Sequence, residues 1–241
     1  MGAGAGVRLR PLTALRPKVM CPVGNRPLID HAIARFDGTT SAVAVNVHHG
    51  RDLLEPHLDG RVHVSVEEPV ALGTAGALAA LRDWIDGRGV IAVNGDTWTT
   101  APVSGLLDGW DGERCRVLLP AGHLFVAGVT IAGALVPWRV VRDLALRPSG
   151  LYESVWAGDA AAGRLDVVHM APGEVCIDCG SPRDYLRANL AWSGGESVIG
   201  DGAVVDGIVE ESVVWPGATV RAGEHLVRAI RAGARTTVLV R

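Results

Sequence analysis

Short apolar runs rich in β-branched residues alternate with segments of helical periodicity from about residue 27 to residue 190. This alternation restricts the fold, because each run is long enough for one buried strand and each helical segment for one short helix. The expected strands cover residues 42–47, 62–66, 90–93, 117–119, 126–131 and 165–168. The expected helices cover residues 27–36, 50–58, 74–85, 138–146 and 182–190. The pattern predicts a Rossmann-like α/β fold, an open mixed sheet with helices on both faces, whose ligands bind at the carboxyl ends of the strands.

The pattern changes after residue 194, where apolar residues begin to recur every six positions. They stand at Ile199 and Val205 and, after a shift of three, at Ile208, Val214, Val220 and Leu226. This period predicts a short left-handed hexapeptide β-helix, for which an ordinary β-meander is the alternative. We therefore expect a catalytic domain over residues 1–193 and a C-terminal segment over 194–241. So short a helix exposes its ends unless it packs on the main domain or on another subunit, which makes the segment a candidate homo-oligomer contact.

Composition narrows the partners and the location. Hydrophobic residues make up 48% of the 241 residues, enough to bury a substantial core. The net charge is −3 with no basic cluster beyond the N-terminal loop, which argues against nucleic acid or an anionic membrane as a partner. There is no apolar run of membrane-spanning length and no signal-peptide pattern, so the expected location is cytoplasmic. The four cysteines, at positions 21, 115, 176 and 179, are expected to be packed free thiols.

The N-terminal loop combines glycines with cations. Lysine and arginine together number 23, and Lys18 is the only lysine. A compact ammonium on a flexible stem has no equivalent in the planar guanidinium, so Lys18 is a candidate site residue, although its survival by chance is the alternative. Glycines at 2, 4 and 6 let backbone N–H groups approach an anion. The loop is neither a Walker A motif, since Gly-Lys-Ser/Thr is absent, nor a dinucleotide fingerprint, since Pro11 interrupts the helix that such a fingerprint needs.

The same loop resembles the signature of a known family. The run is Gly4-x-Gly6-x-Arg8-Leu9-x-Pro11-Leu12-Thr13, continued by Pro17-Lys18 and by Pro22-Val23-x-x-x-Pro27-Leu28-Ile29. It is similar to the signature of the sugar-1-phosphate nucleotidylyltransferases. The resemblance implies transfer of a nucleoside monophosphate from a nucleoside triphosphate to a sugar 1-phosphate, with release of pyrophosphate. It assigns Arg8 and Lys18 to catalysis, and Gly4 and Gly6 to nucleotide binding.

Two aspartates follow extended apolar segments. Asp96 ends the run that starts at residue 90, and Asp178 follows the run over residues 174–177. Mg²⁺ is typically held by one or two carboxylates together with substrate phosphate, although either aspartate alone could be a turn residue or a helix cap. In the family, the positions matching Asn94-Gly95-Asp96 and Asp178-x-Gly180-Ser181-Pro182-x-x-Tyr185-Leu186 carry the metal ligands. The resemblance therefore implies Mg²⁺ as cofactor, held by Asp96 and Asp178.

The segment from residue 67 to residue 78 resembles the family's nucleotide-base segment. Its Gly-Thr-Ala-Gly form is closest to the mannose-1-phosphate guanylyltransferases, which implies GTP and mannose 1-phosphate as substrates. The nucleotide-binding candidates are Glu68, Gly73 and Thr74, and the sugar-binding candidates are Asn94, Gly128 and Glu153. Each has a structural alternative: Thr74 as the N-cap of a helix, Gly128 as a strand glycine, and Glu153 as a solvated helix residue.

The chain departs from the family pattern at two places. Met1 stands directly before Gly2, where the family has a central hydrophobic strand, so we expect either a start codon placed too far downstream or a truncation. The family also has a second lysine at the sugar phosphate, for which Arg139 or Arg183 would have to substitute here unless the acceptor site is altered. Two other functions therefore stay open: a catalytically silent regulatory relative that binds a nucleotide sugar, and a nucleotidylyltransferase for a non-sugar phosphate.

Overall fold

The computed structural model describes residues 1–240, and the chain divides into two compact units. The first comprises Met1–Gly4 with Ala32–Cys176, and the second comprises Ala5–His31 with the chain from Ile177 onward. Each unit joins segments that are far apart in the sequence. The first contains most of the strands and helices between residues 44 and 169, and the second contains the N-terminal loop and the C-terminal strands. No helix in residues 1–240 combines the length and the apolar composition needed to cross a bilayer.

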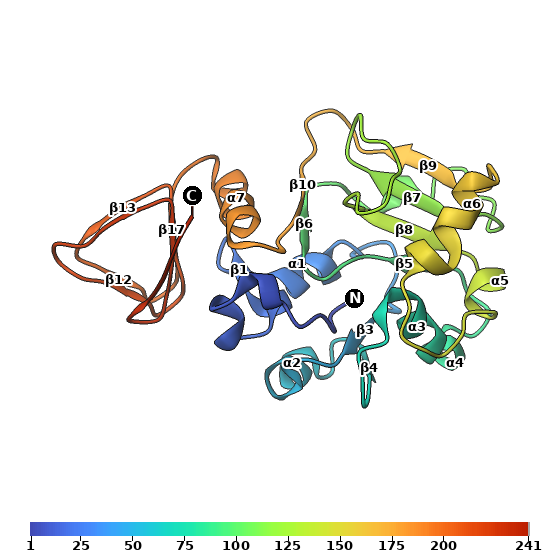
Figure 1. Cartoon of the computed structure of the whole chain (residues 1–241), viewed down its shortest axis with the longest axis horizontal. Helices are drawn as coiled ribbons and strands as arrows, with labels where there is room; N and C mark the ends of the chain where they lie inside the picture. The colour runs from blue at the N-terminus through green and yellow to red at the C-terminus, as the bar shows by residue number, and fades with distance from the viewer. Residues whose placement is uncertain (241) are drawn as a thin grey trace. The chain divides into compact units, whose positions relative to one another are not determined.

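The strands of the first unit form two separate main ladders (Figure 1). The parallel pair joins β3 (Ala44–Val47) to β4 (His63–Val66), with Val45 opposite Val64. The four-stranded sheet has the order β5 (Val90–Ala92), β8 (Gly133–Val136), β7 (Arg116–Leu119) and β9 (Asp166–His169). In it β8 is antiparallel to both neighbours, and β9 is parallel to β7. The predicted mixed α/β organisation is therefore confirmed.

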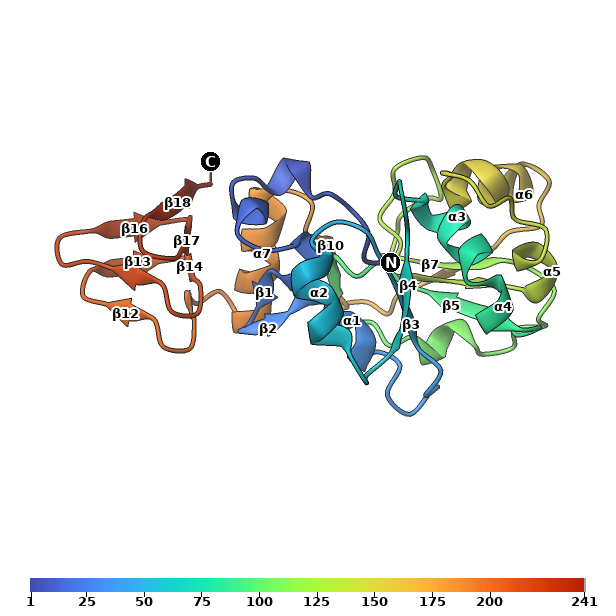
Figure 2. The same cartoon turned by 90° about the horizontal axis from the view of Figure 1, so that it is seen from below.

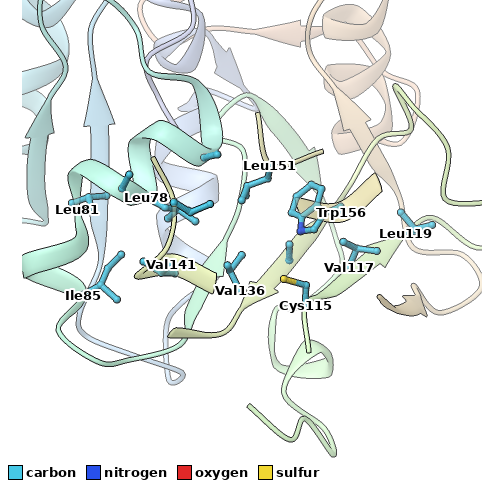
Figure 3. Close-up of a cluster of buried hydrophobic side chains, with 14 residues drawn as sticks. Leu78, Leu81, Ile85, Cys115, Val117, Leu119, Val136, Val141, Leu151 and Trp156 are labelled. Carbon is cyan, nitrogen blue, oxygen red and sulfur yellow. The ribbon is translucent and has the colours of Figure 1, made fainter. Parts of the chain in front are cut away.

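Helices cover one face of the four-stranded sheet. They are α3 (Gly73–Ala80), α4 (Arg82–Ile85), α5 (Trp138–Val141) and the π-helix η5 (Tyr152–Trp156), which continues into α6 (Ala157–Ala161). Figure 3 shows their apolar side chains meeting those of the strands, with Leu78 and Trp156 above Val117 and Val136. The other face packs Leu118 and Leu135 against the short helix η4 (Ser104–Leu106) and nearby loops. Burial of these apolar surfaces stabilises the unit by roughly 25 cal/mol per Å².

Met1 and Gly2 lie between the two ladders. The Met1 amine donates to the Val93 carbonyl at 2.8 Å, and the Gly95 N–H donates to the Met1 carbonyl at 2.8 Å. The Gly2 N–H donates to the Asn46 side-chain oxygen at 2.9 Å, at the end of β3. Among the described residues no ladder joins β3 to β5, so the single open sheet expected from the sequence is divided at this point. At this point Met1 and Gly2 bond to both sides, to Val93 and Gly95 after β5 and to Asn46 of β3.

Some predicted boundaries were wrong, for identifiable reasons. Residues 126–131 form a turn and irregular chain in place of a strand, because Gly128 has φ +79° and the next strand begins only at Gly133. The helix predicted over residues 74–85 is two helices, α3 and α4, separated at Leu81. The helix predicted over residues 138–146 ends at Val141. The helix predicted over residues 50–58 is confirmed as α2 (Arg51–Leu58).

The N-terminal part of the second unit is built from short elements around one helix. The 3₁₀ helices η1 (Val7–Leu9), η2 (Leu12–Ala14) and η3 (Lys18–Met20) precede a hairpin of β1 (Pro22–Val23) and β2 (Arg26–Pro27) and helix α1 (Leu28–Ala34). Two further short strands are β6 (Thr97–Thr99), which belongs to the first unit, and β10 (Cys176–Asp178), which starts at the last residue of that unit. The longest helix, α7 (Pro182–Ser193), has Ser181 as N-cap, whose hydroxyl accepts from the Asp184 N–H, and ends at Gly194 with φ +73°. Both caps agree with the helix predicted there.

The C-terminal segment passes through three short parallel ladders (Figure 2). The first joins β11 (Val198–Ile199), β14 (Val213–Val214) and β17 (Ala229–Ala232). The second joins β12 (Val204–Val205) to β15 (Thr219–Val220), and the third joins β13 (Ile208–Glu210) to β16 (His225–Val227). The antiparallel strand β18 (Thr236–Leu239) closes the first ladder against β17. The apolar residues Val214, Val220 and Leu226 are buried inside these strands.

Candidate active site

Gly6 is held in a conformation that only glycine adopts easily. Its φ is +61°, and a Cβ at this position would lie 2.8 Å from the Thr13 methyl carbon and 3.0 Å from Lys18 Cβ. The Thr13 hydroxyl donates to the Gly6 carbonyl at 2.9 Å, which fixes the turn from the other side. A Cβ added to Gly4 would meet no heavy atom within 4 Å. The spacing of Gly6, Thr13 and Lys18 in the sequence is thus explained by direct packing.

Asp178 is shared by two cations of the N-terminal loop. The Lys18 ammonium lies 3.2 Å from Asp178 Oδ1, and one guanidinium nitrogen of Arg8 lies 3.6 Å from Asp178 Oδ2. The exposed fractions of these side chains are 9% for Lys18, 42% for Asp178 and 75% for Arg8. One carboxylate against two cations leaves a net positive charge, and Arg8 is free of packing on most of its surface. This cluster is therefore suited to binding an anion that reaches it from solvent.

Gly180 makes room for this cluster. A Cβ on Gly180 would lie 2.6 Å from an Arg8 guanidinium nitrogen and 3.0 Å from Asp178 Oδ2. Any larger residue at position 180 would therefore push Arg8 away from the carboxylate. The structure thus brings together Arg8, Lys18 and Asp178, three residues predicted from the sequence.

Asp96 lies in the first unit, in the turn between β5 and β6, and is partly buried. Asn94, two residues earlier, is exposed, while Gly95 between them is buried and donates to Met1. Within residues 1–240 no group of three or more His, Cys, Asp or Glu side chains is assembled as a metal site. The assignment of Asp96 and Asp178 as magnesium ligands stays a prediction. Two carboxylates together with substrate phosphate oxygens would supply the ligands that Mg²⁺ requires.

A buried polar network that the sequence did not reveal connects Gly2 to the segment over residues 67–72. Glu67 is 1% exposed, and its carboxylate accepts from the Asn46 side-chain N–H at 2.8 Å and from the Leu72 N–H at 2.7 Å. Asn46 in turn accepts from Gly2. By contrast Glu68, the predicted nucleotide ligand, is exposed and pairs with Arg51. The one available signal was an asparagine inside the apolar run at residues 42–47, because buried polar groups need partners.

The start of α3 is tightly packed against residues 147–149. A Cβ on Gly73, whose φ is +70°, would lie 2.6 Å from the Ser149 carbonyl oxygen. The Ala75 N–H at the helix start donates to that same oxygen at 3.0 Å. The Thr74 hydroxyl accepts from the Leu151 N–H at 2.8 Å, so Thr74 is inside the helix and is not its N-cap, contrary to the prediction. Nucleotide binding by Gly73 and Thr74 stays a prediction. Some hydrogen-bonding groups at this end of the helix already bond to residues 149 and 151 of the protein itself.

The predicted sugar ligands lie at exposed positions of the first unit. Gly128 is in an exposed turn and not in the predicted strand, and Glu153 is an exposed residue of the π-helix. The Glu153 carboxylate lies directly over Gly150, where an added Cβ would come within 2.2 Å of it. Arg139, one candidate for the missing lysine, bonds to the Glu113 backbone and lies 3.6 Å from the Glu113 carboxylate. Arg183, the other candidate, is exposed at the start of α7.

Comparisons with known proteins agree with the fold and with the family that the N-terminal loop resembles. Residues 1–112 match the family described as nucleotidyl transferase. A crystal structure of a putative glucose-1-phosphate thymidylyltransferase from Bacillus anthracis superposes with a TM-score of 0.67 at 17% identity, covering 79% of this chain and 92% of that one. This likeness shows the fold alone. The fold and the loop together define the class of nucleotidyltransferases.

Sequence relatives give a narrower family. The N-acetylmuramate alpha-1-phosphate uridylyltransferase of Caulobacter vibrioides is 31% identical over 191 residues, which cover 74% of this chain and 76% of that protein. Mannose-1-phosphate guanylyltransferase 1 of Arabidopsis thaliana is 27% identical over 222 residues, covering 76% of this chain and 61% of that protein. The chain belongs to the sugar-1-phosphate nucleotidylyltransferase family, and it is an enzyme of the nucleotidyltransferase class.

Proposed function

We propose that the protein transfers a nucleoside monophosphate from a nucleoside triphosphate to a sugar 1-phosphate, forming a nucleotide sugar and pyrophosphate. The observation that carries the proposal is the cluster of Lys18, Arg8 and Asp178 beside Gly6. A phosphate oxygen of the sugar 1-phosphate attacks the α-phosphorus of the triphosphate, the bond to the bridging oxygen breaks, and pyrophosphate leaves with that oxygen. No covalent intermediate on the protein is needed, so positioning and charge neutralisation supply the rate.

The two cations have different roles in this proposal. Lys18 is nearly buried and oriented by Asp178, so it contacts phosphate oxygens at a defined position. Arg8 is exposed and can follow the leaving group, so it neutralises the charge that develops on pyrophosphate. Asp178 keeps both cations in place before the nucleotide binds. By analogy with arginines that stabilise phosphoryl transfer, loss of Arg8 is expected to lower kcat about a thousandfold.

The donor chemistry of Asp96 and Asp178 fits Mg²⁺, because carboxylate oxygens are the hard ligands that this ion prefers. Asp178 is 42% exposed and therefore open to a ligand from solvent. When bound, Mg²⁺ would neutralise phosphate charge and orient the triphosphate. These two residues are the ones we propose to hold it.

The substrates are proposed from the relatives and from the segment over residues 67–78. The Gly-Thr-Ala-Gly sequence and the plant guanylyltransferase support GTP and mannose 1-phosphate. The 31% identity to a uridylyltransferase that acts on N-acetylmuramate 1-phosphate favours UTP and an amino-sugar acceptor as the second candidate.

We also propose that the C-terminal segment is the short hexapeptide β-helix predicted from the sequence. Its three parallel ladders, each joining successive passes of the chain, support this assignment. The domain boundary at residue 193 stays a prediction, since α7 and the chain that follows it belong to the same compact unit. Size-exclusion chromatography with light scattering, on the full chain and on a variant with Ile208→Ser, tests the proposed subunit contact through this segment.

The reaction is tested by measuring pyrophosphate release from GTP, UTP, dTTP, CTP and ATP, each paired with several phosphorylated acceptors. The acceptors are mannose 1-phosphate, N-acetylmuramate 1-phosphate, glucose 1-phosphate and phosphocholine, with Mg²⁺ and with chelator. Release with sugar 1-phosphates alone supports the proposal. Release only with phosphocholine would assign a non-sugar acceptor. Nucleotide-sugar binding without release in any pairing would overturn the proposal in favour of a regulatory role.

A further inference from the structure

Trp215 is a buried aromatic residue that contacts the N-terminal loop directly through Arg16 and indirectly through Tyr185. It lies between β14 and β15 in the C-terminal segment and is 2% exposed. The guanidinium carbon of Arg16 lies 4.5 Å from the centroid of its ring. Its indole N–H donates to the Tyr185 hydroxyl at 2.9 Å, and the Tyr185 hydroxyl donates to the Pro22 carbonyl. The indole therefore holds the loop at two anchors. The first anchor is Arg16, which it contacts directly, and the second is Pro22, which it reaches through Tyr185.

These two points flank Lys18 on both sides in the sequence. Arg16 precedes it by two positions, and Pro22 follows it by four. Between them the chain is short and internally bonded, since the Met20 N–H donates to the Pro17 carbonyl and the Cys21 N–H donates to the Lys18 carbonyl. Holding Arg16 and Pro22 therefore restricts the backbone of Lys18, whose ammonium reaches Asp178.

A further side chain of α7 reinforces the second anchor, the Pro22 carbonyl. Asn189 is fully buried, and its side chain donates to the Pro22 carbonyl at 3.4 Å and accepts from the Gly24 N–H at 3.2 Å. Burial raises the pKa of the Tyr185 hydroxyl well above its ordinary value, so Tyr185 keeps its proton at all pH values near neutral and remains able to donate. The Pro22 carbonyl is thus held by two buried side chains of α7, Tyr185 and Asn189.

The first anchor is not a hydrogen bond between buried groups like the second one, because Arg16 is a charged residue at a partly exposed position that stacks on the indole ring. A guanidinium over an indole face is attracted by the ring, and the attraction disappears when the ring is removed. A residue whose only task was to fill space inside the C-terminal strands would not need to face a cation of the loop. The position of Arg16, one residue before Pro17-Lys18, connects this stacking to the predicted catalytic lysine.

We propose that Trp215 is a positioning residue for Lys18, and that the C-terminal strands through it set the geometry of the phosphate-binding loop. The proposal rests on the proposed function only in that Lys18 is taken to contact phosphate. It extends that function by making the C-terminal segment part of the apparatus that orients the site, in addition to any role as a subunit contact.

The first experiment uses the fact that Lys18 is the only lysine of the chain. The rate of Lys18 acylation by an amine-reactive ester is measured by peptide mass spectrometry on the folded full-length protein, without substrate. In the native protein the reaction is expected to be slow, because the side chain is nearly buried and ion-paired. We expect Trp215→Leu and Arg16→Met each to raise the rate about fivefold. The double variant should react no faster than Trp215→Leu alone, because that variant has already lost the stacking on Arg16.

Matched controls separate positioning from general loss of stability. Leu226→Ala removes a buried side chain from the same strands, and Arg228→Met removes an exposed guanidinium of the same segment. Neither should change the acylation rate after correction for the unfolded fraction measured by circular dichroism. Trp215→Phe keeps an aromatic face for Arg16 but loses the N–H, so it should retain most of the protection if stacking dominates. If Trp215→Leu does not fold, Arg16→Met with Trp215→Phe decides the question.

The second experiment measures kinetics with the best substrate pair. Trp215→Leu and Arg16→Met are expected to raise the KM for the nucleoside triphosphate about fivefold while leaving the KM for the sugar phosphate unchanged. An unchanged acylation rate in folded Trp215→Leu and Arg16→Met would overturn the proposal. Absence of turnover in the native protein with every pairing would overturn the proposed function instead, and the acylation rates would still decide the role of Trp215.

Discussion

Lys18 and Asp178, separated by 160 positions in the chain, are joined by a 3.2 Å contact between the ammonium and one carboxylate oxygen. Arg8 approaches the other oxygen of the same carboxylate at 3.6 Å. The carboxylate thus keeps two cations near each other, which would otherwise repel. An incoming polyphosphate meets cations that are already oriented, which lowers the reorganisation that binding requires.

Replacement of Lys18 tests this arrangement directly. Lys18→Ala is expected to abolish turnover, and Lys18→Arg to restore little of it, because the larger planar guanidinium cannot occupy the nearly buried space beside Gly6. Steady-state kinetics and circular dichroism together check the prediction. Arg10→Ala, at an exposed position of the same loop, is the control and should keep near-native activity. Near-native turnover in Lys18→Ala would remove Lys18 from the mechanism.

Replacement of Asp96 tests the proposed metal site. Asp96→Asn preserves size and removes one negative charge, so we expect turnover to be lost at ordinary Mg²⁺ concentrations while the far-ultraviolet circular dichroism stays native. Raising Mg²⁺ should recover part of the activity. Asp108→Asn, which removes one negative charge at an exposed position outside the predicted site, is the control and should keep the native Mg²⁺ dependence. A Mg²⁺ dependence identical to that of the native enzyme would exclude Asp96 as a ligand.

Substitution of Gly6 should harm the loop through two separate effects. Gly6→Ala forces a non-glycine residue to φ +61°, at a cost of roughly 1–2 kcal/mol, and brings its Cβ to 2.8 Å from the Thr13 methyl carbon. We expect weaker nucleoside triphosphate binding by calorimetry. Thr13→Ser removes that methyl group and keeps the hydroxyl that donates to Gly6. The double variant should therefore bind better than Gly6→Ala alone, and equal binding would show that the methyl contact is irrelevant.

The network of Asn46 and Glu67 should be a major source of stability in the first unit. Asn46→Leu removes one of two observed donors to a buried carboxylate and leaves the Gly2 N–H without its acceptor. A hydrogen bond to a charged group contributes about 1.5–3 kcal/mol, so a loss of this size in the free energy of unfolding is expected. Asn94→Leu, at an exposed asparagine, is the matched control. Urea unfolding measures both, and equal stabilities would contradict the prediction.

The buried thiols should make the protein less stable at high pH. Burial raises the pKa of Cys21 and of Cys115 from 9.0 to about 12. Because the raised pKa means that the folded state favours the neutral thiol, this contribution is complete below pH 9 and is lost as the pH rises toward 12. Each group should lower the free energy of unfolding by up to about 1.4 kcal/mol per pH unit in that window. Unfolding of Cys21→Ala and Cys115→Ala at pH 7 and pH 10 measures the effect, which should shrink in each variant.

The same pKa shifts predict low chemical reactivity. At pH 8.5 alkylation of Cys21 and Cys115 should be roughly a thousandfold slower in the folded protein than in guanidinium, since the thiolate is the reactive form. Mass spectrometry of the labelled peptides checks this, with the denatured protein as the reference. Rapid labelling of Cys21 in the native state would show that its surroundings open.

Local patterns in the sequence were sufficient for much of the fold. The runs that became β3, β4, β5, β7 and β9 have the length and β-branched content of buried strands, and α2 and α7 have recognisable periodicity and termini. Residues 126–131 have the apolar composition of a strand but do not form one, because Gly128, with φ +79°, ends an extended segment. Thr74 was expected to cap α3 because its side chain suits a cap, but a distant N–H, that of Leu151, takes its hydroxyl.

By itself the sequence determined the α/β class and the loop of glycines and cations, because backbone requirements and charge are properties of local sequence, and its motifs predicted Arg8, Lys18 and Asp178 as site residues. Only the tertiary structure decided that Asp178 pairs with both cations, that Glu67 and not Glu68 is buried, and that Trp215 stacks under Arg16. Partners of buried polar and aromatic groups are chosen by long-range packing, since desolvation makes each such group bond to whatever the fold places beside it.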